Sequence, residues 1–263
     1  METTRRETID VGRDAGVACI TLNRPDSINA INDAMRREIP QALRELDADA
    51  GVRVIVVRGA GPRGFCAGAD LKEERPAGPT STAARRPGAI WLEAFDAVRK
   101  PLVAAIHGYC MGGGLEIALA CDLRIAAPGA LFSLPETGLG LIPGGGGTQR
   151  LPRIVGLGKA LDMMITGDRI DAAEAQRCGL VTRLTASVES LEAETLELVR
   201  RIAARPPLAT RFVKEAAYAA LERELAAGLR LEKDLFAMLL STDDRHEAVA
   251  AFREKRAPIF KES

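Results

Sequence analysis

Two glutamates, Glu116 and Glu136, lie in apolar and glycine-rich surroundings. Glu116 follows three glycines and is flanked by Leu115 and Ile117, while Glu136 follows Pro135 and precedes a second glycine-rich stretch. Burying a carboxylate costs free energy unless the group is paired or used. Two such carboxylates can hold one water molecule and act on it as base and acid. The competing interpretation is structural, with Glu116 paired in a core and Glu136 on a surface turn.

Backbone amides close to these glutamates in the sequence are suited to bind an anion. The glycines at 112–114 follow the apolar run Leu102–Ile106 and open a short apolar helix. Glycine lets the backbone turn with its N–H groups exposed, and a helix N-terminus adds a partial positive charge. Such a site suits a phosphate or a developing oxyanion. A further segment, Gly64–Leu71, has small residues at 67–69 that allow a ligand to approach the backbone.

The sequence lacks the motifs of nucleotide binding and of nucleophilic catalysis. The glycines at 144–147 are followed by Thr148 instead of the Lys-Ser/Thr of a phosphate loop, and no dinucleotide-binding Gly-x-Gly-x-x-Gly opens a helix after a strand. Cys66 and Cys110 have no histidine or asparagine motif beside them, and no Gly-x-Ser-x-Gly elbow occurs. His107, one of only two histidines, continues a strand pattern as a core histidine would. We therefore expect neither a metal site nor a cofactor.

Apolar strand patterns alternate with helical patterns in the first part of the chain, which predicts an α/β core with crossover connections. A helical pattern around residues 35–46 contains Pro40, which predicts a kink or a late start. The segment between Glu73 and Gly88 is rich in Pro, Gly, Ser, Thr and Arg and is typical of a binding loop. The strand patterns are Val17–Leu22, Val52–Val57, Leu102–Ile106 and Leu123–Ala126.

From about residue 187 the patterns are helical only. We therefore divide the chain into a catalytic core of residues 1–186 and a helical region of residues 187–263. The apolar residues of the helical region exceed what one small helical layer would bury, so this region is expected to make the protein an oligomer. They include Phe236, Met238, Leu239 and Leu240.

Composition excludes several classes of protein. The 263 residues carry 36 Lys plus Arg and 36 Asp plus Glu, so the formal net charge is zero, unlike that of a chain dedicated to nucleic acid. No apolar run approaches the roughly 18–20 residues of a membrane helix, and the N-terminus is polar. Five scattered cysteines without a Cys-x-x-Cys motif suggest reduced thiols. We expect a cytoplasmic enzyme.

These segments together resemble the crotonase superfamily, also called the enoyl-CoA hydratase/isomerase family. The similarity spans nearly the whole chain in ordered segments, ending in a tail at 251–260. The matching segments are Ile20–Pro25, Phe65–Leu71, His107–Glu116, Pro135–Glu136 and Ile142–Pro152. The resemblance implies a spiral of repeated ββα units followed by a helical trimerisation region. It also implies homotrimers, often paired into hexamers, and an acyl-CoA thioester as substrate, so that coenzyme A enters as part of the substrate.

The resemblance also assigns roles to the residues singled out above. The backbone amides of Ala69 and Gly113 would bind the thioester oxygen, where negative charge grows in the transition state. Related hydratases carry glutamates at the positions of Glu116 and Glu136, which favours reversible addition of water to a 2,3-trans-enoyl-CoA. We expect Glu116 to activate the water and Glu136 to protonate Cα, although the two can share these roles. Gly144 occupies the position whose backbone contacts the catalytic water.

Residues for the coenzyme A and acyl groups carry over from the same resemblance. Phe236, Phe252 and Lys255 correspond to residues that a neighbouring subunit lends to the nucleotide end. Asp26 departs from the family pattern and would be mildly unfavourable beside phosphates. The segment from Phe65 to Lys72 looks especially like that of methylglutaconyl-CoA hydratases, while the segment between Glu73 and Gly88 defines neither acyl length nor branching. The other matching residues are Ser27, Ile28, Ala67, Asp70, Leu71, Tyr109 and Pro135.

Three alternatives stay open at this stage. Two carboxylates also permit a dehydratase or a double-bond isomerase of the same family. Some methylglutaconyl-CoA hydratase-like proteins bind RNA through a basic helix, and here the corresponding helix carries Arg36, Arg37 and Arg44, diluted by four acidic residues. A catalytically inactive CoA-binding protein is the third. Fatty acid metabolism, aromatic breakdown and amino-acid catabolism all use this chemistry, so the sequence does not assign a pathway.

Overall fold

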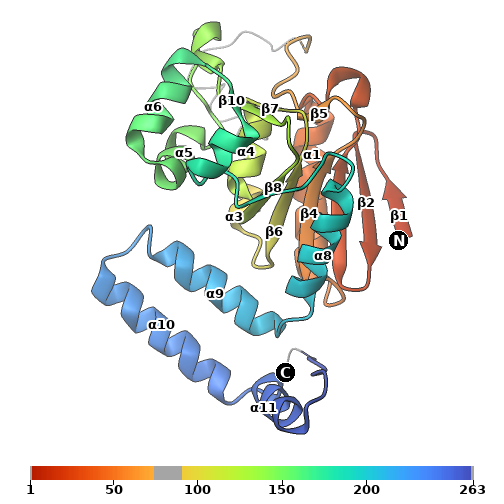
Figure 1. The fold of residues 1–263 in the computed structure, drawn as a ribbon, viewed down its shortest axis with the longest axis vertical. Helices are drawn as coiled ribbons and strands as arrows, with labels where there is room; N and C mark the ends of the chain where they lie inside the picture. The colour runs from red at the N-terminus through yellow and green to blue at the C-terminus, as the bar shows by residue number, and fades with distance from the viewer. Residues whose placement is uncertain (1, 74–90, 262–263) are drawn as a thin grey trace.

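The chain folds into two sheets with helices around them in the computed structural model, which describes residues 2–73 and 91–261 (Figure 1). In the described part, the larger sheet has seven strands. In spatial order they are β1 (Glu2–Arg5), β2 (Ile9–Asp14), β3 (Val17–Leu22), β4 (Val54–Gly59), β6 (Leu102–Ile106), β8 (Leu123–Ala126) and β11 (Arg183–Leu184). The smaller sheet has the order β10 (Ile170–Asp171), β9 (Leu131–Ser133), β7 (Tyr109–Met111) and β5 (Gly64–Cys66).

A repeated unit connects the two sheets. β4 lies in the larger sheet and β5 in the smaller, and the pairs β6/β7 and β8/β9 repeat this arrangement. A helix follows each of the first two pairs, α3 (Glu93–Asp96) and α4 (Gly113–Ala120). After the third pair come the short η2 (Glu136–Leu139) and the helices α5 (Gly147–Val155) and α6 (Leu157–Thr166). The predicted spiral of ββα units is therefore confirmed, although the three-residue strands of the smaller sheet had no clear pattern of their own.

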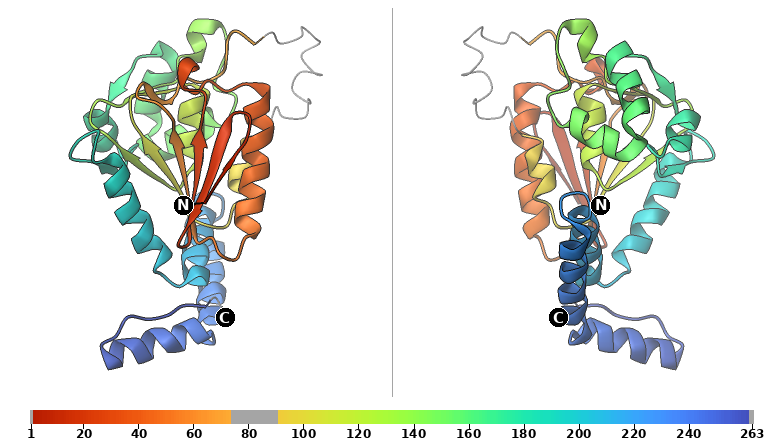
Figure 2. Two further views of the ribbon diagram at one scale, coloured as in Figure 1. Left: turned by 90° about the vertical axis from the view of Figure 1, so that its right-hand side faces the viewer. Right: turned by 90° about the vertical axis from the view of Figure 1, so that its left-hand side faces the viewer.

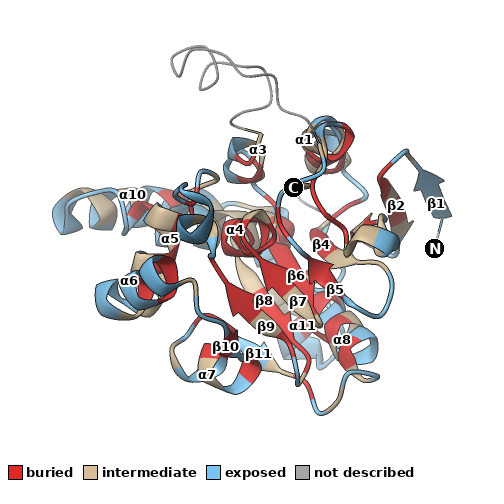
Figure 3. Cartoon of the chain, turned by 90° about the horizontal axis from the view of Figure 1, so that it is seen from above, coloured by how far each residue is buried: buried red, intermediate tan, exposed pale blue. Residues whose placement is uncertain are grey.

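The central strands are buried on both faces, as their continuous apolar runs predict. In β4, Ile55 and Val57 belong to the core between the sheets and helices, whereas Val54 and Val56 face the other way. That second face is covered by α8 (Leu191–Ala203), through Leu198 and its neighbours. Figure 3 shows the buried residues concentrated in these strands.

Helix α1 (Asp33–Ala48) packs one apolar face on the core through Met35, Ile39, Leu43 and Leu46. Asn32 caps it by accepting a hydrogen bond from the backbone N–H of Met35. The expected late start is wrong, because the helix begins seven residues before Pro40 and continues beyond it. Asp171 likewise caps α7 (Ala172–Arg177) by accepting a hydrogen bond from the backbone N–H of Glu174.

Helices α9 (Pro207–Ala219), α10 (Leu225–Leu240) and α11 (Asp243–Glu254) extend away from the sheets (Figures 1 and 2). Much of the apolar surface of α10 is exposed, for example at Leu225 and Phe236. Helix α8 belongs to the predicted helical region as well, but it packs on the larger sheet. The division of the chain between residues 186 and 187 stays a prediction. The segment between Glu73 and Gly88, which is expected to be a binding loop, lies outside the described residues. In the described ranges, no helix is long and apolar enough to cross a membrane.

Candidate active site

Glu116 lies in the first turn of α4 and is 5% exposed. Its Oε1 accepts hydrogen bonds from the backbone N–H groups of Gly145, at 2.6 Å, and Gly147, at 2.9 Å. Burial raises the pKa of Glu116, and the opposing effects of these two donors and of the nearby charge of Arg150 offset it only in part. The buried carboxylate of α4 is therefore held through one oxygen in a fixed orientation.

The four glycines at 144–147 supply those donors because the backbone there approaches Glu116 closely. A Cβ on Gly145 would lie 2.6 Å from Oε2 of Glu116 and 2.3 Å from Cδ1 of Leu92. Gly146 has φ +101°, and α5 begins at the next residue. This loop is thus a cradle for a carboxylate and not for a phosphate.

Glu136 begins η2 and is half-buried beside the first carboxylate. Its Oε1 lies close to Gly112, where a Cβ would be 3.0 Å away. Its Oε2 is buried and has no hydrogen-bond partner among the described residues. Burial raises the pKa of Glu136, and the charge of Glu116 raises it further. The structure therefore brings the two predicted glutamates together, each with a raised pKa.

Two unpaired backbone amides lie on the same side of α4. The amides of Ala69 and Gly113 have no acceptor among residues 2–73 and 91–261. A Cβ on Gly113 would lie 3.9 Å from the nitrogen of Ala69, so the two segments are in contact. The neighbours of Ala69 are fixed by hydrogen bonds from Ile31 N to Gly68 O and from Asp70 N to Ile31 O. Two N–H groups without a protein acceptor in the described ranges therefore lie on neighbouring segments.

The segments at 24–31 and 67–71 lie side by side. They contain the residues predicted to contact coenzyme A, which are Ser27, Ile28, Ala67, Asp70 and Leu71. The N–H of Ala67 donates to Ile28 O, and Ile28 has a positive φ of 50°. Arg24 forms an ion pair with Asp70 at 2.9 Å, which lowers the pKa of that carboxyl. Ser27 is half-buried and Leu71 is 74% exposed, at the open edge of this strip.

The remaining predicted residues lie in different places. Pro135 precedes Glu136, and the exposed Gly144 precedes the two donors to Glu116. Tyr109 lies in β7 with the Arg169 guanidinium 5.5 Å from its ring centre. Phe236 and Phe252, on α10 and α11, are highly exposed and lie away from α4, as does Lys255 after α11 (Figures 1 and 2).

Competing chemistries find little support in the described residues. Burial raises the pKa of the Cys66 thiol to about 12 and also raises that of Cys110, so neither is a ready nucleophile. His107 bonds through Nε2 to Gly61 O at 2.8 Å. No group of three or more metal-ligating side chains occurs in the described ranges. Arg36, on the helix considered for RNA, is paired with Asp33 and Glu73.

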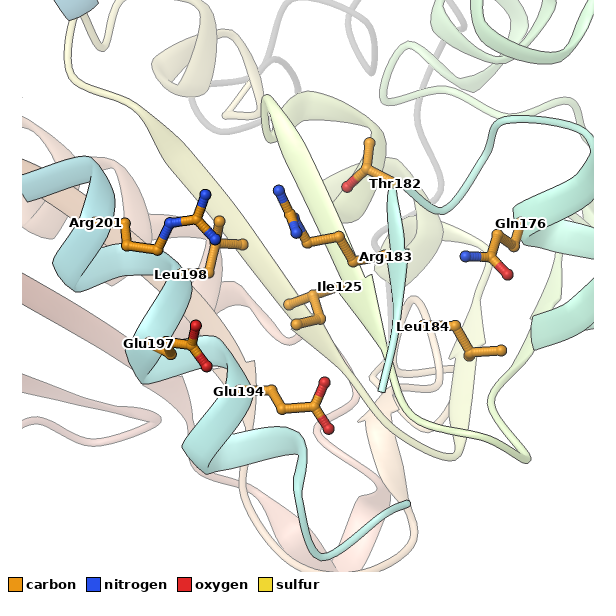
Figure 4. A pocket seen from close by; sticks show the side chains of 9 residues that line it. All are labelled: Ile125, Gln176, Thr182, Arg183, Leu184, Glu194, Glu197, Leu198 and Arg201. Atoms are coloured by element: carbon orange, nitrogen blue, oxygen red, sulfur yellow. The ribbon is translucent and has the colours of Figure 1, made fainter. Parts of the chain in front are cut away.

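A groove of about 450 Å³ lies between β8, β11 and α8 (Figure 4), and neither Glu116 nor Glu136 lines it. Its side chains are mostly polar and of both charges, so no single ligand charge is favoured. They include Arg183, Glu194, Glu197 and Arg201.

Sequence reasoning misses the two donors to Glu116, Gly145 and Gly147, and the pair Arg150 and Asp96 that lies behind Gly145. It considers the glycine run as a phosphate loop and assigns a backbone contact to Gly144 alone. A buried carboxylate needs donors, and a run of glycines offers exposed N–H groups, so this signal was present in the sequence. Arg150 and Asp96 are 54 residues apart, and no local pattern joins them.

Comparison with known proteins agrees with this geometry. A family model described as enoyl-CoA hydratase/isomerase matches residues 12–263. A protein of Mycobacterium leprae named a probable enoyl-CoA hydratase is 45% identical over 254 residues, covering 97% of this chain and 98% of the relative. A protein of the same description from Rhizobium meliloti is 44% identical over 255 residues, with coverage of 97% and 98%. The crystal structure of an enoyl-CoA hydratase from Bacillus anthracis superposes with a TM-score of 0.93 at 39% identity, covering 98% of this chain and 100% of that one.

Proposed function

The chain belongs to the enoyl-CoA hydratase/isomerase family, and we propose that it is an enoyl-CoA hydratase. It adds water reversibly to a 2,3-trans-enoyl-CoA to give a 3-hydroxyacyl-CoA. The observation that carries this proposal is the pair of neighbouring carboxylates, the buried Glu116 and the half-buried Glu136, beside the unpaired amides of Ala69 and Gly113. A reaction that takes up a water and builds negative charge on a thioester oxygen needs both features.

The two amides act on the thioester carbonyl. As the hydroxyl group adds to Cβ, the electrons of the double bond move toward the carbonyl oxygen, which gains enolate character. Donors fixed at that position by the backbone stabilise the developing charge more than the ground state. Gly113 begins α4, so the partial positive charge of the helix N-terminus acts in the same direction.

The glutamates divide the proton transfers. Two N–H donors favour the ionised form of Glu116, which takes a proton from the water as its oxygen attacks Cβ. Glu136, whose pKa is raised by burial and by its neighbour's charge, supplies a proton to Cα. The product carries both elements of water, and transfer of one proton from Glu116 to Glu136 restores the starting state. General acid–base help of this kind contributes about 10²–10⁴-fold to a rate.

Substrate binding and assembly follow the same proposal. The coenzyme A moiety lies along residues 24–31 and 67–71, and Phe236, Phe252 and Lys255 reach its nucleotide end from a neighbouring subunit. The apolar exposure of α10 supports this, because a homotrimer or homohexamer would cover it. Gly144 contacts the catalytic water through its backbone. No metal or separate cofactor is required, and the five free cysteines suit the cytoplasm.

Product analysis in D₂O tests the proposal. The protein is incubated with crotonyl-CoA and with longer or branched 2-enoyl-CoAs, and the products are identified by mass spectrometry and NMR. A hydratase gives a 3-hydroxyacyl-CoA with one deuterium at Cα. A shifted double bond without uptake of water would instead assign isomerase activity, and thioester binding without turnover would assign a non-catalytic role.

A further inference from the structure

We propose that Asp96 and Arg150 form a positioning pair that holds the glycine loop at 144–147 against Glu116. This inference rests on the proposed function of Glu116 as the base. Arg150, on α5, donates through Nη2 to both carboxylate oxygens of Asp96, at 2.6 and 2.7 Å. Its Nη1 donates to the carbonyl oxygen of Gly145 at 3.0 Å.

These contacts form a continuous chain from the edge of the molecule to the base. Gly145 accepts from Arg150 through its carbonyl and donates through its N–H to Glu116 at 2.6 Å. The guanidinium group has a rigid fork, so fixing one side on Asp96 also fixes the direction of the other. A lysine in place of Arg150 would lack this fork and could not make all three contacts with the same geometry.

The loop is adapted to the guanidinium group. A Cβ on Gly146 would lie 2.0 Å from Nη1 of Arg150, and the φ of Gly146 is +101°. The side chain therefore lies directly against the backbone between the two donors to Glu116. Asp96 is half-exposed, whereas Arg150 is mostly buried, so the carboxylate anchors the arginine from the solvent side.

The charges around Glu116 indicate the direction of the effect. The charge of Glu116 raises the pKa of Glu136 on η2, and the charge of Arg150 on α5 lowers the pKa of Glu116. Asp96 on α3 partly offsets the charge of Arg150 from the far side. Loss of Arg150 therefore removes a favourable charge and loosens two N–H donors, and both changes raise the pKa of Glu116.

The test compares Arg150→Gln, Asp96→Ala and the double variant by two independent readouts. The first is the pH profile of kcat and KM for crotonyl-CoA hydration, and the second is hydrogen exchange of the amides at 141–151. Arg153→Gln is the matched control, because Arg153 is an exposed arginine of the same helix whose hydrogen bonds within the described residues go to Gln149 alone.

We expect Arg150→Gln to lower kcat about tenfold, the factor set by losing one hydrogen bond to a charged group, with little change in KM. The acid limb of its profile moves to higher pH, and the Gly145 and Gly147 amides exchange faster. Asp96→Ala shows a smaller effect in the same direction on kcat and exchange, and adds nothing in the Arg150→Gln background. Arg153→Gln behaves as wild type.

Wild-type kcat and an unmoved acid limb in folded Arg150→Gln would overturn the inference, even if exchange became faster. Unchanged exchange would overturn it as well. If Arg150→Gln does not fold, the same two readouts are taken from Asp96→Ala, whose site is half-exposed. Wild-type kcat or unchanged exchange in that variant would then overturn the inference. If the wild-type protein hydrates no enoyl-CoA, the proposed function fails, and exchange alone then decides whether the pair holds the loop.

Discussion

Oε1 of Glu116 lies 2.6 Å from the backbone nitrogen of Gly145, a residue 29 positions further along the chain. Gly147 donates to the same oxygen, and no hydrogen bond reaches Oε2 in the described part of the chain. The carboxylate is therefore fixed through one oxygen and available to a water molecule through the other. This contact joins the helix that carries the base to the loop that follows the second glutamate.

Gly145→Ala should lower activity at least tenfold. The added Cβ would meet Cδ1 of Leu92 at 2.3 Å and Oε2 of Glu116 at 2.6 Å, so the loop must move and both donors shift. Hydration kinetics measure the loss. Gly158→Ala, where a Cβ meets nothing within 4 Å, is the control and should retain wild-type activity. Equal activity of the two variants would show that the loop does not position the base.

Glu136→Gln should raise Tm at neutral pH. Burial and the charge of Glu116 raise the pKa of Glu136 above its ordinary value of 4.5. Such a group stabilises the fold fully below pH 4.5 and loses that contribution as pH rises through the folded-state pKa. Glutamine does not ionise, so the advantage of the variant should vanish at acidic pH. Thermal melts against pH, with the exposed Glu222→Gln as control, measure this; a constant difference would contradict it.

Arg124→Met should destabilise the protein by about 1–3 kcal/mol, because it leaves buried carbonyl oxygens without their donor. Arg124 is 5% exposed and donates to Leu180 O, Ala118 O and Cys121 O. Two of these carbonyls belong to the end of α4, whose other end carries Gly113 and Glu116. Urea unfolding measures the change in the free energy of unfolding. A change under 1 kcal/mol would mean that water replaces the arginine at this helix end.

Tyr218→Phe should destabilise the protein by about 0.5–1.5 kcal/mol, the usual contribution of one hydrogen bond. The Tyr218 hydroxyl donates to Asp122 at 2.9 Å, and Lys214 forms an ion pair with the same carboxylate at 2.9 Å. These contacts tie α9 to the sheet core and are distant from the glutamates. Urea unfolding should shift while kcat stays at the wild-type value; a loss of kcat with unchanged stability would contradict this separation.

The fold could be predicted where the pattern was local. Continuous apolar runs such as Leu102–Ile106 are buried strands, as expected. Strands of three residues, such as Gly64–Cys66, are too short for a period to be visible. The late start expected from Pro40 is wrong because the packing of Ile39 and Leu43 on the core outweighs one missing hydrogen bond, while the alternative of a kink stays a prediction.

The site was predictable only in part. A carboxylate in an apolar helix identified Glu116, because its burial requires a partner or a use. The partner itself depends on how the chain returns after β9, which no local pattern shows. Arg150 and Asp96 are charged residues on short helices, and only the tertiary structure shows that they act on the loop. The roles of the predicted site residues in turnover stay predictions.

The central claim is that Glu116 and Glu136 act as a unit on one water molecule. The most direct test is kcat/KM for crotonyl-CoA hydration in Glu116→Gln, Glu136→Gln and the double variant, each confirmed as folded by circular dichroism. We expect each single change to lower kcat/KM by about 10²–10⁴-fold, and the double variant to be little worse than the weaker single one. Wild-type kcat/KM in either single variant would contradict the claim and leave that glutamate with a structural role.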